Sequence, residues 1–274
     1  MRRVLTGAGG LPLAVREAGS PGSPPVVLLH GWAASSAAWA AQLADPSLTG
    51  AYHLIAPDLR GHGDSGVAPD GYDDPAVWAA DLAAVLDHAG APAVVVGWSY
   101  GGLVITDYLR ERGSAGIAGI VLVGAITEIG PGRPGGTVGP AMGSVLREVL
   151  AEDPRVAVPA LLSLVERMTA EQATGEQVQL RLADCLRVPA RVRRALFHRN
   201  LGGDDVLVNV DVPTLVVHGE ADEVIDLAAG RHAAGKIPGA IGRWFPDVGH
   251  MPFAERVEEF DDVLRTFAGS VTNH

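Results

Sequence analysis

The chain is organised around an apolar run that ends at a serine between glycines: Val94-Val95-Val96-Gly97-Trp98-Ser99-Tyr100-Gly101-Gly102. Its apolar half is typical of a strand buried on both faces of a parallel sheet. The glycines permit a sharp turn into a following helix, and this turn leaves Ser99 at its apex. A serine held there lies beside free backbone N–H groups of the new helix, which is the environment that a nucleophile requires. The pattern Gly97-x-Ser99-x-Gly101 therefore predicts a nucleophile elbow.

Short apolar runs alternate with amphipathic segments along most of the chain. Strands are predicted at 11–16, 25–30, 53–57, 94–98, 119–124, 213–218 and 242–245. Helices are predicted at 36–43, 75–89, 103–111, 226–235 and from 252 onward. Alternation of strand and helix implies a mostly parallel sheet with helices on both faces. The pattern predicts an α/β fold.

The alternation stops between residues 126 and 210. A Gly/Pro-rich entry is followed by segments that read as helices, at 142–151, 158–168, 175–185 and 189–200. A long insertion without strands, placed within an alternation of strands and helices, is typical of a helical cap over the edge of the sheet. We therefore expect a core made of residues 1–125 and 211–274, with residues 126–210 forming the cap.

The composition disfavours several classes of protein. The chain has 274 residues, 47% of them apolar, and a formal net charge of −11, which argues against nucleic-acid and anionic-membrane partners. Cys185 is the only cysteine, so neither a disulfide framework nor a cysteine metal site is expected. No apolar run approaches membrane-spanning length, and residues 5–13 are too broken by glycine and proline for a signal-peptide core. These features predict a cytoplasmic protein that acts on a small molecule, and they leave its oligomeric state open.

No cofactor or metal site is predicted. The run Gly130-Pro131-Gly132-Arg133-Pro134-Gly135 satisfies the dinucleotide pattern G-x-G-x-x-G, but it contains prolines and no helix opens on it. Arg60, His62 and Asp64 share a loop and are interpreted as hydrogen-bonding groups that hold it, rather than as metal ligands. Cys185 is interpreted as a small buried residue of the cap.

A nucleophilic serine needs a general base, and the base needs an acid that holds its tautomer. In a parallel sheet these groups gather beyond the carboxyl ends of the strands. Asp222 follows one strand closely, and His250 lies in the loop after the last strand. The chain order Ser99, Asp222, His250 fits a catalytic triad, with Glu128 as the competing acid. His218 is interpreted as structural.

Five motifs in this order make the chain similar to the α/β-hydrolase family. They are His30-Gly31-Trp32, Asp58-Leu59-Arg60-Gly61-His62-Gly63-Asp64-Ser65, the elbow itself, His218-Gly219-Glu220-Ala221-Asp222, and Gly249-His250. The resemblance runs nearly end to end and implies about eight strands, with the cap inserted after the sixth. It also implies an oxyanion hole formed by the backbone N–H groups of Trp32 and Tyr100.

The leading functional hypothesis is a serine hydrolase that cleaves a carboxylic ester or lactone of a small, apolar substrate through an acyl-enzyme on Ser99. The same triad in relatives supports cofactor-free haloperoxidase or perhydrolase activity, carbon–carbon bond hydrolysis, and biosynthetic acyl transfer or cyclisation. Serine at position 99 disfavours the dehalogenases and epoxide hydrolases, which carry aspartate there. A non-catalytic small-molecule receptor is the alternative from another class of protein.

Overall fold

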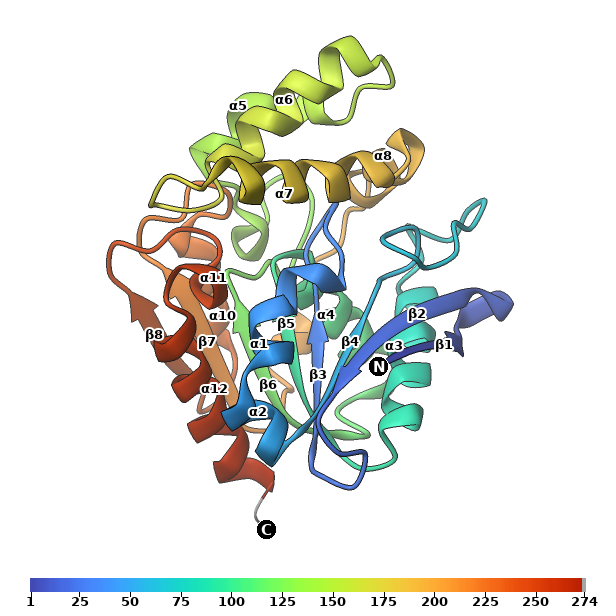
Figure 1. Cartoon of the computed structure of the whole chain (residues 1–274), viewed down its shortest axis with the longest axis vertical. Coiled ribbons are helices and arrows are strands. Elements are labelled where there is room, and N and C mark those ends of the chain that lie inside the picture. The colour runs from blue at the N-terminus through green and yellow to red at the C-terminus, as the bar shows by residue number, and fades with distance from the viewer. Residues whose placement is uncertain (273–274) are drawn as a thin grey trace.

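The computed structural model describes residues 1–272 and contains one eight-stranded sheet (Figure 1). The strands across the sheet are β1 (Arg2–Thr6), β2 (Pro12–Ala18), β4 (His53–Pro57), β3 (Pro25–Leu29), β5 (Ala93–Trp98), β6 (Ile117–Val123), β7 (Thr214–Gly219) and β8 (Ile241–Phe245). Strand β2 is antiparallel to both of its neighbours, and every other adjacent pair is parallel. The predicted α/β fold is confirmed.

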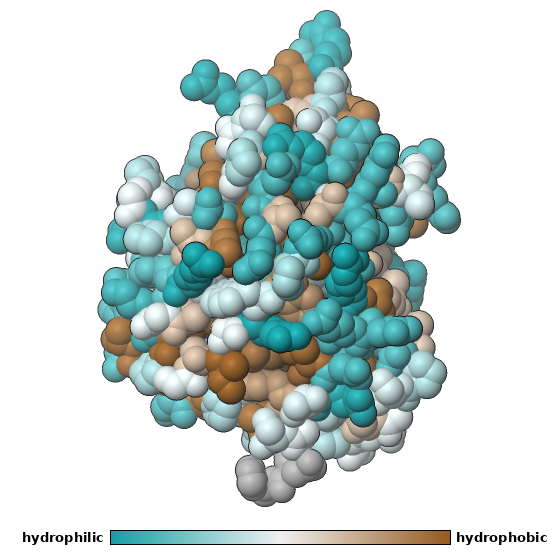
Figure 2. Space-filling model, turned by 90° about the vertical axis from the view of Figure 1, so that its left-hand side faces the viewer, coloured by the Kyte–Doolittle hydropathy of each residue, from teal (hydrophilic) through white to brown (hydrophobic). Residues whose placement is uncertain are grey.

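The two edge strands are the most exposed parts of the sheet. Strand β1 is exposed at most of its positions, which removes the apolar alternation by which a strand is recognised, and the sequence pattern does not reveal it. It supplies the eighth strand that the family resemblance implies. At the opposite edge, Ile241 of β8 is 63% exposed. Figure 2 views this side of the molecule and shows hydrophobic side chains gathered in its lower half.

Helices cover both faces of the sheet (Figure 1). One face carries the α1 (Ala40–Ala44), α2 (Pro46–Ala51), α11 (Pro252–Glu255) and α12 (Val257–Thr272) helices, and the other carries α3 (Pro75–Ala89), α4 (Tyr100–Arg112) and α10 (Leu227–Lys236). Three short 3₁₀ turns lie at Ala8–Gly10, Ser36–Trp39 and Pro134–Gly136. The closing helix expected from residue 252 is broken at Arg256, whose φ of −132° and ψ of 60° are not helical.

Strands β3 and β5 pair directly, although β4 lies between them in the chain. The chain leaves β3 toward one side of the sheet and continues from β5 toward the other. At such a switch point, the loops that follow the two strands diverge and leave a crevice beyond their carboxyl ends. These two loops carry Trp32 and Ser99.

Four helices of the inserted segment lie above the carboxyl edge of the sheet (Figure 1). They are α5 (Pro140–Val149), α6 (Pro154–Glu166), α7 (Gly175–Arg187) and α8 (Ala190–Phe197). Helix α6 begins earlier than its pattern predicts and continues through Pro159, because packing of its apolar face outweighs the loss of one backbone donor. The short helix α9 (Asp204–Leu207) contacts α4 and α10 instead. The division at 126 and 210 stays a prediction.

Arg193 of α8 holds the cap together from inside. Its Nε donates to the carbonyl of Val149 at 3.1 Å, and its Nη1 donates to the carbonyls of Val188 at 2.8 Å and Cys185 at 3.3 Å. These carbonyls lie at the C-terminal ends of α5 and α7, where backbone acceptors lack helical partners. One buried guanidinium therefore joins three cap helices. Cys185 is buried in the cap, as its interpretation requires.

Candidate active site

Ser99 joins β5 to α4 in a backbone conformation that is strained for a residue with a side chain. Its φ of 54° and ψ of −117° lie outside the regions that L-residues favour. The surroundings hold it there: its N–H donates to the carbonyl of Val123 at 3.0 Å, and its own carbonyl accepts from Gly102 and Ile126 at 3.0 and 3.1 Å. Strain of this kind clusters at functional sites, where the surrounding structure maintains it.

Two glycines allow the strand and the helix to approach this closely. A Cβ atom on Gly97 would lie 2.7 Å from the backbone of Gly101, and a Cβ on Gly101 would lie 2.8 Å from the carbonyl oxygen of Leu29. Gly31, in the loop after β3, faces the serine itself, since a Cβ there would lie 2.9 Å from the Cβ of Ser99. Any side chain at these positions would push the elbow away from its neighbours.

His250 and Asp222 form a buried pair beyond the ends of β7 and β8. The Nδ1 of His250 lies 2.7 Å from the Oδ2 of Asp222, and both side chains are almost completely buried. The other carboxylate oxygen accepts the backbone N–H groups of Val224 and Ile225 at 2.8 and 3.0 Å. Burial alone would raise the pKa of Asp222, but the charges and hydrogen bonds of His250 and His218 hold this pKa well below its usual range. Asp222 stays ionised, and His250 keeps its Nε2 free to accept a proton.

His218 is a further partner of the acid that sequence reasoning misses. Its Nε2 lies 3.2 Å from the Oδ2 of Asp222 and 3.1 Å from the carbonyl oxygen of Ile225. Because both neighbours are acceptors, this nitrogen carries the proton. Both side chains are fully buried, and the contact between them helps to fix the orientation of the Asp222 carboxylate. The only signal in the sequence is its position four residues before Asp222.

Trp98, which precedes Ser99 in the chain, contacts His250. Its indole N–H donates to the carbonyl of His250 at 3.0 Å, and the two rings lie 5.4 Å apart. Among the hydrogen bonds of residues 1–272, none joins the hydroxyl of Ser99 to His250. Catalytic hydrogen bonds are often long without a substrate and shorten when one binds.

Two backbone donors are available for an oxyanion. Within residues 1–272, neither the N–H of Trp32 nor that of Tyr100 donates to a protein acceptor. Tyr100 is the first residue of α4, so its N–H lies in the first turn, where helical partners are missing. Both groups flank the crevice beside Ser99, and the Trp32 indole itself donates to the carbonyl of Arg193 in the cap at 3.2 Å.

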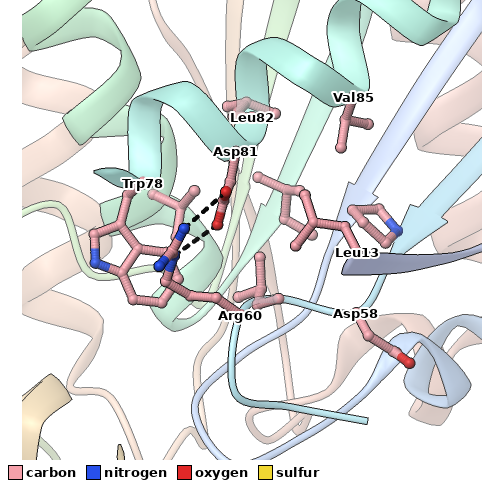
Figure 3. A pocket seen from close by; sticks show the side chains of 11 residues that line it. Leu13, Asp58, Arg60, Trp78, Asp81, Leu82 and Val85 are labelled. Carbon is pink, nitrogen blue, oxygen red and sulfur yellow. Dashed lines mark hydrogen bonds and ion pairs between the residues drawn. The ribbon is translucent and has the colours of Figure 1, made fainter. Parts of the chain in front are cut away.

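The loop after β4 supports the loop that carries Trp32. Arg60 forms two hydrogen bonds with Asp81 of α3, at 2.7 and 2.9 Å (Figure 3). The Nε2 of His62 accepts the N–H of Ala33 at 3.3 Å, and its Nδ1 donates to the carbonyl of Arg60 at 2.9 Å. Burial lowers the pKa of His62 to about 3, so the ring stays neutral. The interpretation of Arg60 and His62 as loop-holding groups is confirmed.

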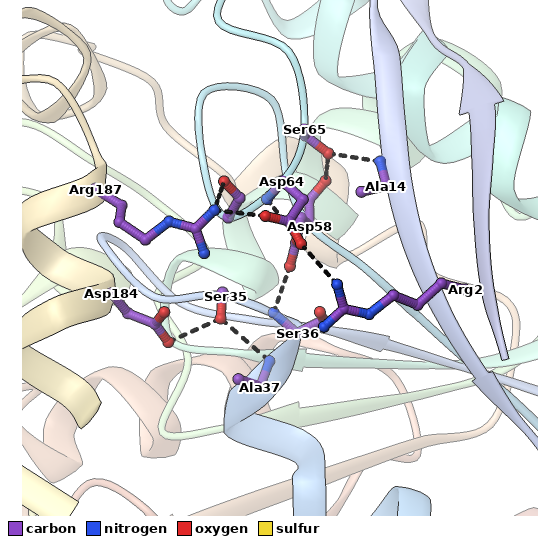
Figure 4. Close-up of polar contacts among 11 residues, drawn as sticks. Arg2, Ala14, Ser35, Ser36, Ala37, Asp58, Asp64, Ser65, Asp184 and Arg187 are labelled. Carbon is purple, nitrogen blue, oxygen red and sulfur yellow. Dashed lines mark hydrogen bonds and ion pairs between the residues drawn. The ribbon is translucent and has the colours of Figure 1, made fainter.

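Asp58 and Asp64 complete this support (Figure 4). The carboxylate of Asp58 accepts the N–H of Ser36 at 2.7 Å and the N–H of Asp64 at 2.8 Å. Asp64 thus holds the loop through its backbone. Its carboxylate instead pairs with Arg187 of α7 at 2.5 Å and with Arg2 at 3.5 Å. Asp64 therefore also joins the core to the cap.

Glu128, the competing acid, lies away from His250. Its two carboxylate oxygens accept the N–H groups of Gly135 and Gly203, both at 2.8 Å, at the base of the cap. Its potential ligand atoms and those of Asp204 and His232 lie within 4.8 Å of one another. These atoms are paired with backbone donors, with each other and with the ammonium group of Lys236.

A serine on a strained turn, a histidine paired with a buried aspartate, and two free N–H groups beside the crevice are typical of serine hydrolases. Residues 26–263 match the model of the alpha/beta hydrolase family, and the chain belongs to this family. None of the helices in residues 1–272 combines the length and apolar character that crossing a membrane requires.

Several known proteins are similar to this chain over most of their length. The crystal structure of the esterase RhEst1 from Rhodococcus sp. ECU1013 superimposes with a TM-score of 0.93 at 43% identity, covering 98% of this chain and 99% of that protein. A pimeloyl-(acyl-carrier protein) methyl ester esterase of Vibrio campbellii is 27% identical over 89% of this chain and 94% of its own length. A non-heme haloperoxidase of Rhodococcus erythropolis is 29% identical over 82% of this chain and 83% of its own length.

Proposed function

We propose that this chain is a carboxylic ester hydrolase that uses Ser99 as its nucleophile and His250 as its general base, with the carboxylate of Asp222 orienting the histidine. The observation that carries the proposal is the buried 2.7 Å contact between His250 and Asp222, beyond the same sheet edge as the strained serine. The esterases among the similar proteins support ester hydrolysis.

The mechanism follows from these positions. His250 takes the proton of Ser99 as its oxygen attacks the ester carbonyl, and Asp222 stabilises the imidazolium that forms. The N–H groups of Trp32 and Tyr100 bind the oxyanion, and losing one such donor typically costs about 3 to 4 kcal/mol in the transition state. His250 then protonates the leaving alcohol. Water, activated by the same ring, attacks the acyl-enzyme and releases the carboxylic acid.

Replacement of the nucleophile tests this proposal. We expect Ser99→Ala to lower kcat/KM for p-nitrophenyl butyrate by about 10⁴-fold or more, because no other group replaces the attacking oxygen. The melting temperature of the variant and its circular dichroism spectrum check that it folds. Labelling by a fluorophosphonate should occur in the parent and not in the variant. Near-full activity of Ser99→Ala would refute the assignment, and a parent that binds small molecules without labelling would indicate a receptor.

Perhydrolysis is a second candidate, because a non-heme haloperoxidase is among the similar proteins. In that reaction hydrogen peroxide replaces water in attacking the acyl-enzyme. Acetate- and peroxide-dependent bromination of monochlorodimedone would detect it. Carbon–carbon bond hydrolysis and acyl transfer or cyclisation on the same triad are tested by product analysis with the corresponding diketones and alcohol acceptors.

We also propose that the enzyme acts on small, apolar esters or lactones in the cytoplasm. The free, buried thiol of Cys185 fits a reducing compartment. Esterase activity that co-fractionates with cytoplasmic markers would support this location, and recovery with secreted proteins would contradict it.

A further inference from the structure

A cavity of about 370 Å³ lies between α7 of the cap and the chain segment that follows β3. Its wall is mostly apolar and includes Ala33, Ala37, Met168, Leu180, Cys185 and Ala254. Trp98 and Met251 also line it, and they are the chain neighbours of Ser99 and His250. The cavity therefore borders the residue that precedes Ser99 and the residue that follows His250.

Arg181 of α7 places a cation in this apolar wall. Within residues 1–272 its guanidinium makes no hydrogen bond or ion pair, and its Nη1 atom is buried without a partner. Burial lowers the pKa of Arg181, yet a guanidinium stays protonated in proteins. A buried N–H without an acceptor is costly, so buried polar groups nearly always have a partner. Arg181 as a whole is only partly buried, and an acceptor that entered the cavity would supply the partner that residues 1–272 do not provide.

The carboxylates near Arg181 are committed elsewhere. Both oxygens of Glu255 accept backbone N–H groups, those of Gly249 at 2.9 Å and Ala170 at 2.7 Å. Asp184, which also lines the cavity, accepts the hydroxyl of Ser35 at 2.8 Å (Figure 4). Neither carboxylate lies within ion-pair distance of Arg181. The acceptor is thus expected from a ligand rather than from the protein.

We propose that this cavity binds an aliphatic arm of the substrate that ends in a carboxylate, and that Arg181 pairs with this carboxylate. The preferred substrates are then half-esters of aliphatic dicarboxylic acids, which have an apolar chain and one charged end, and this narrows the apolar substrates proposed above. A guanidinium matches a carboxylate through two parallel hydrogen bonds, and the apolar wall accommodates the methylene chain. Asp184 opposes the bound charge, but it is only partly buried and water screens it. The inference rests on the proposed ester hydrolysis at Ser99.

Kinetics on matched esters test the preference. We expect kcat/KM for monomethyl adipate or monomethyl suberate at pH 7 to exceed that of the corresponding dimethyl ester. Arg181→Gln should lower this ratio by about 10- to 100-fold, the range of a charge-assisted hydrogen bond, and Arg181→Lys should keep part of it. Asp184→Asn should raise the ratio, because it removes the opposing charge.

The control is Arg147→Gln, which removes the same charge from an exposed position of the cap that does not line the cavity. It should leave the ratio within twofold of the parent. Absence of a half-ester preference in the parent, or an unchanged ratio in Arg181→Gln, would overturn the inference.

Binding of adipate, which has no ester bond, separates this inference from the catalytic proposal. In the Ser99→Ala background, calorimetry should detect adipate binding that Arg181→Gln weakens by about 10- to 100-fold. If Ser99→Ala still hydrolysed esters while adipate binding depended on Arg181, the catalytic proposal would fail and the cavity assignment would stand. Equal adipate binding by the Ser99→Ala protein with Arg181 and by the Ser99→Ala protein with Arg181→Gln would refute the cavity assignment.

Discussion

The elbow and the cap differ in the contacts that hold them in place. The elbow follows β5, whose residues are all buried. Close backbone contacts at Gly97 and Gly101 leave no room for a Cβ atom at these two positions. The cap also packs through buried apolar side chains such as Leu161 and Leu196, but long polar side chains add to its contacts, with Arg193 inside it and Arg187 reaching the core. Steric contacts set positions rigidly, whereas hydrogen bonds from flexible side chains adjust. We therefore expect the elbow to tolerate added side-chain atoms less well than the helices of the cap.

The largest difference between the two regions should come from glycine substitutions. Gly97→Ala places a methyl group 2.7 Å from the backbone of Gly101, so we expect a loss of about 1–3 kcal/mol in unfolding free energy and at least ~100-fold in kcat/KM. Gly143→Ala, in helix α5 with open space around it, should stabilise the protein by about 0.4–1 kcal/mol. Urea unfolding and ester kinetics measure both effects. Equal tolerance at the two sites would contradict the steric description of the elbow.

A second difference should appear in the pH dependence of stability. His62 of the core is buried and its folded-state pKa is lowered to about 3, so between about pH 6.5 and 3 the unfolded chain binds a proton that the folded protein excludes. Stability should then fall as the pH decreases through this window, by roughly 1.4 kcal/mol per pH unit from this group.

Substitution of the histidine measures its share of the slope. His62→Asn should reduce the dependence of unfolding free energy on pH between 6 and 4, while His198→Gln, at an exposed position of the cap, should leave it unchanged. Denaturant unfolding at several pH values gives both slopes. Identical slopes for the parent and His62→Asn would show that the buried ring does not control acid sensitivity.

The smallest effect is expected where the cap meets the core. Arg187→Gln removes the pair with Asp64, but both side chains are close to half exposed, so water and salt screen the charges. We expect less than about 1 kcal/mol of destabilisation, which vanishes in about 1 M salt. Unfolding at low and high salt tests this. A loss of several kcal/mol would show that the cap depends on this one contact.

Much of the fold is readable from local pattern. Seven strands and the elbow follow from apolar runs and glycines, because strand and turn geometry depend on residues adjacent in the chain. The family resemblance adds the eighth strand and the pair of N–H donors. The exposed edge strand Arg2–Thr6 escapes local pattern, since only its pairing with β2 makes it a strand.

The sequence alone places Ser99, Asp222 and His250 at one edge of a parallel sheet, because the order of strands and loops dictates where each loop emerges. It favours Asp222 over Glu128 as the carboxylate partner of the histidine, and the structure places Asp222 beside His250. The cap gives a second example. The pattern around residues 189–200 predicts a helix that contains several arginines, but it does not tell which of them is buried. Which arginine is buried, and which one of α7 lacks a partner, depends on groups far away in the chain. Steric limits on the backbone depend on residues adjacent in the chain and can be predicted from them. The partners of long charged side chains are determined only when distant segments pack together.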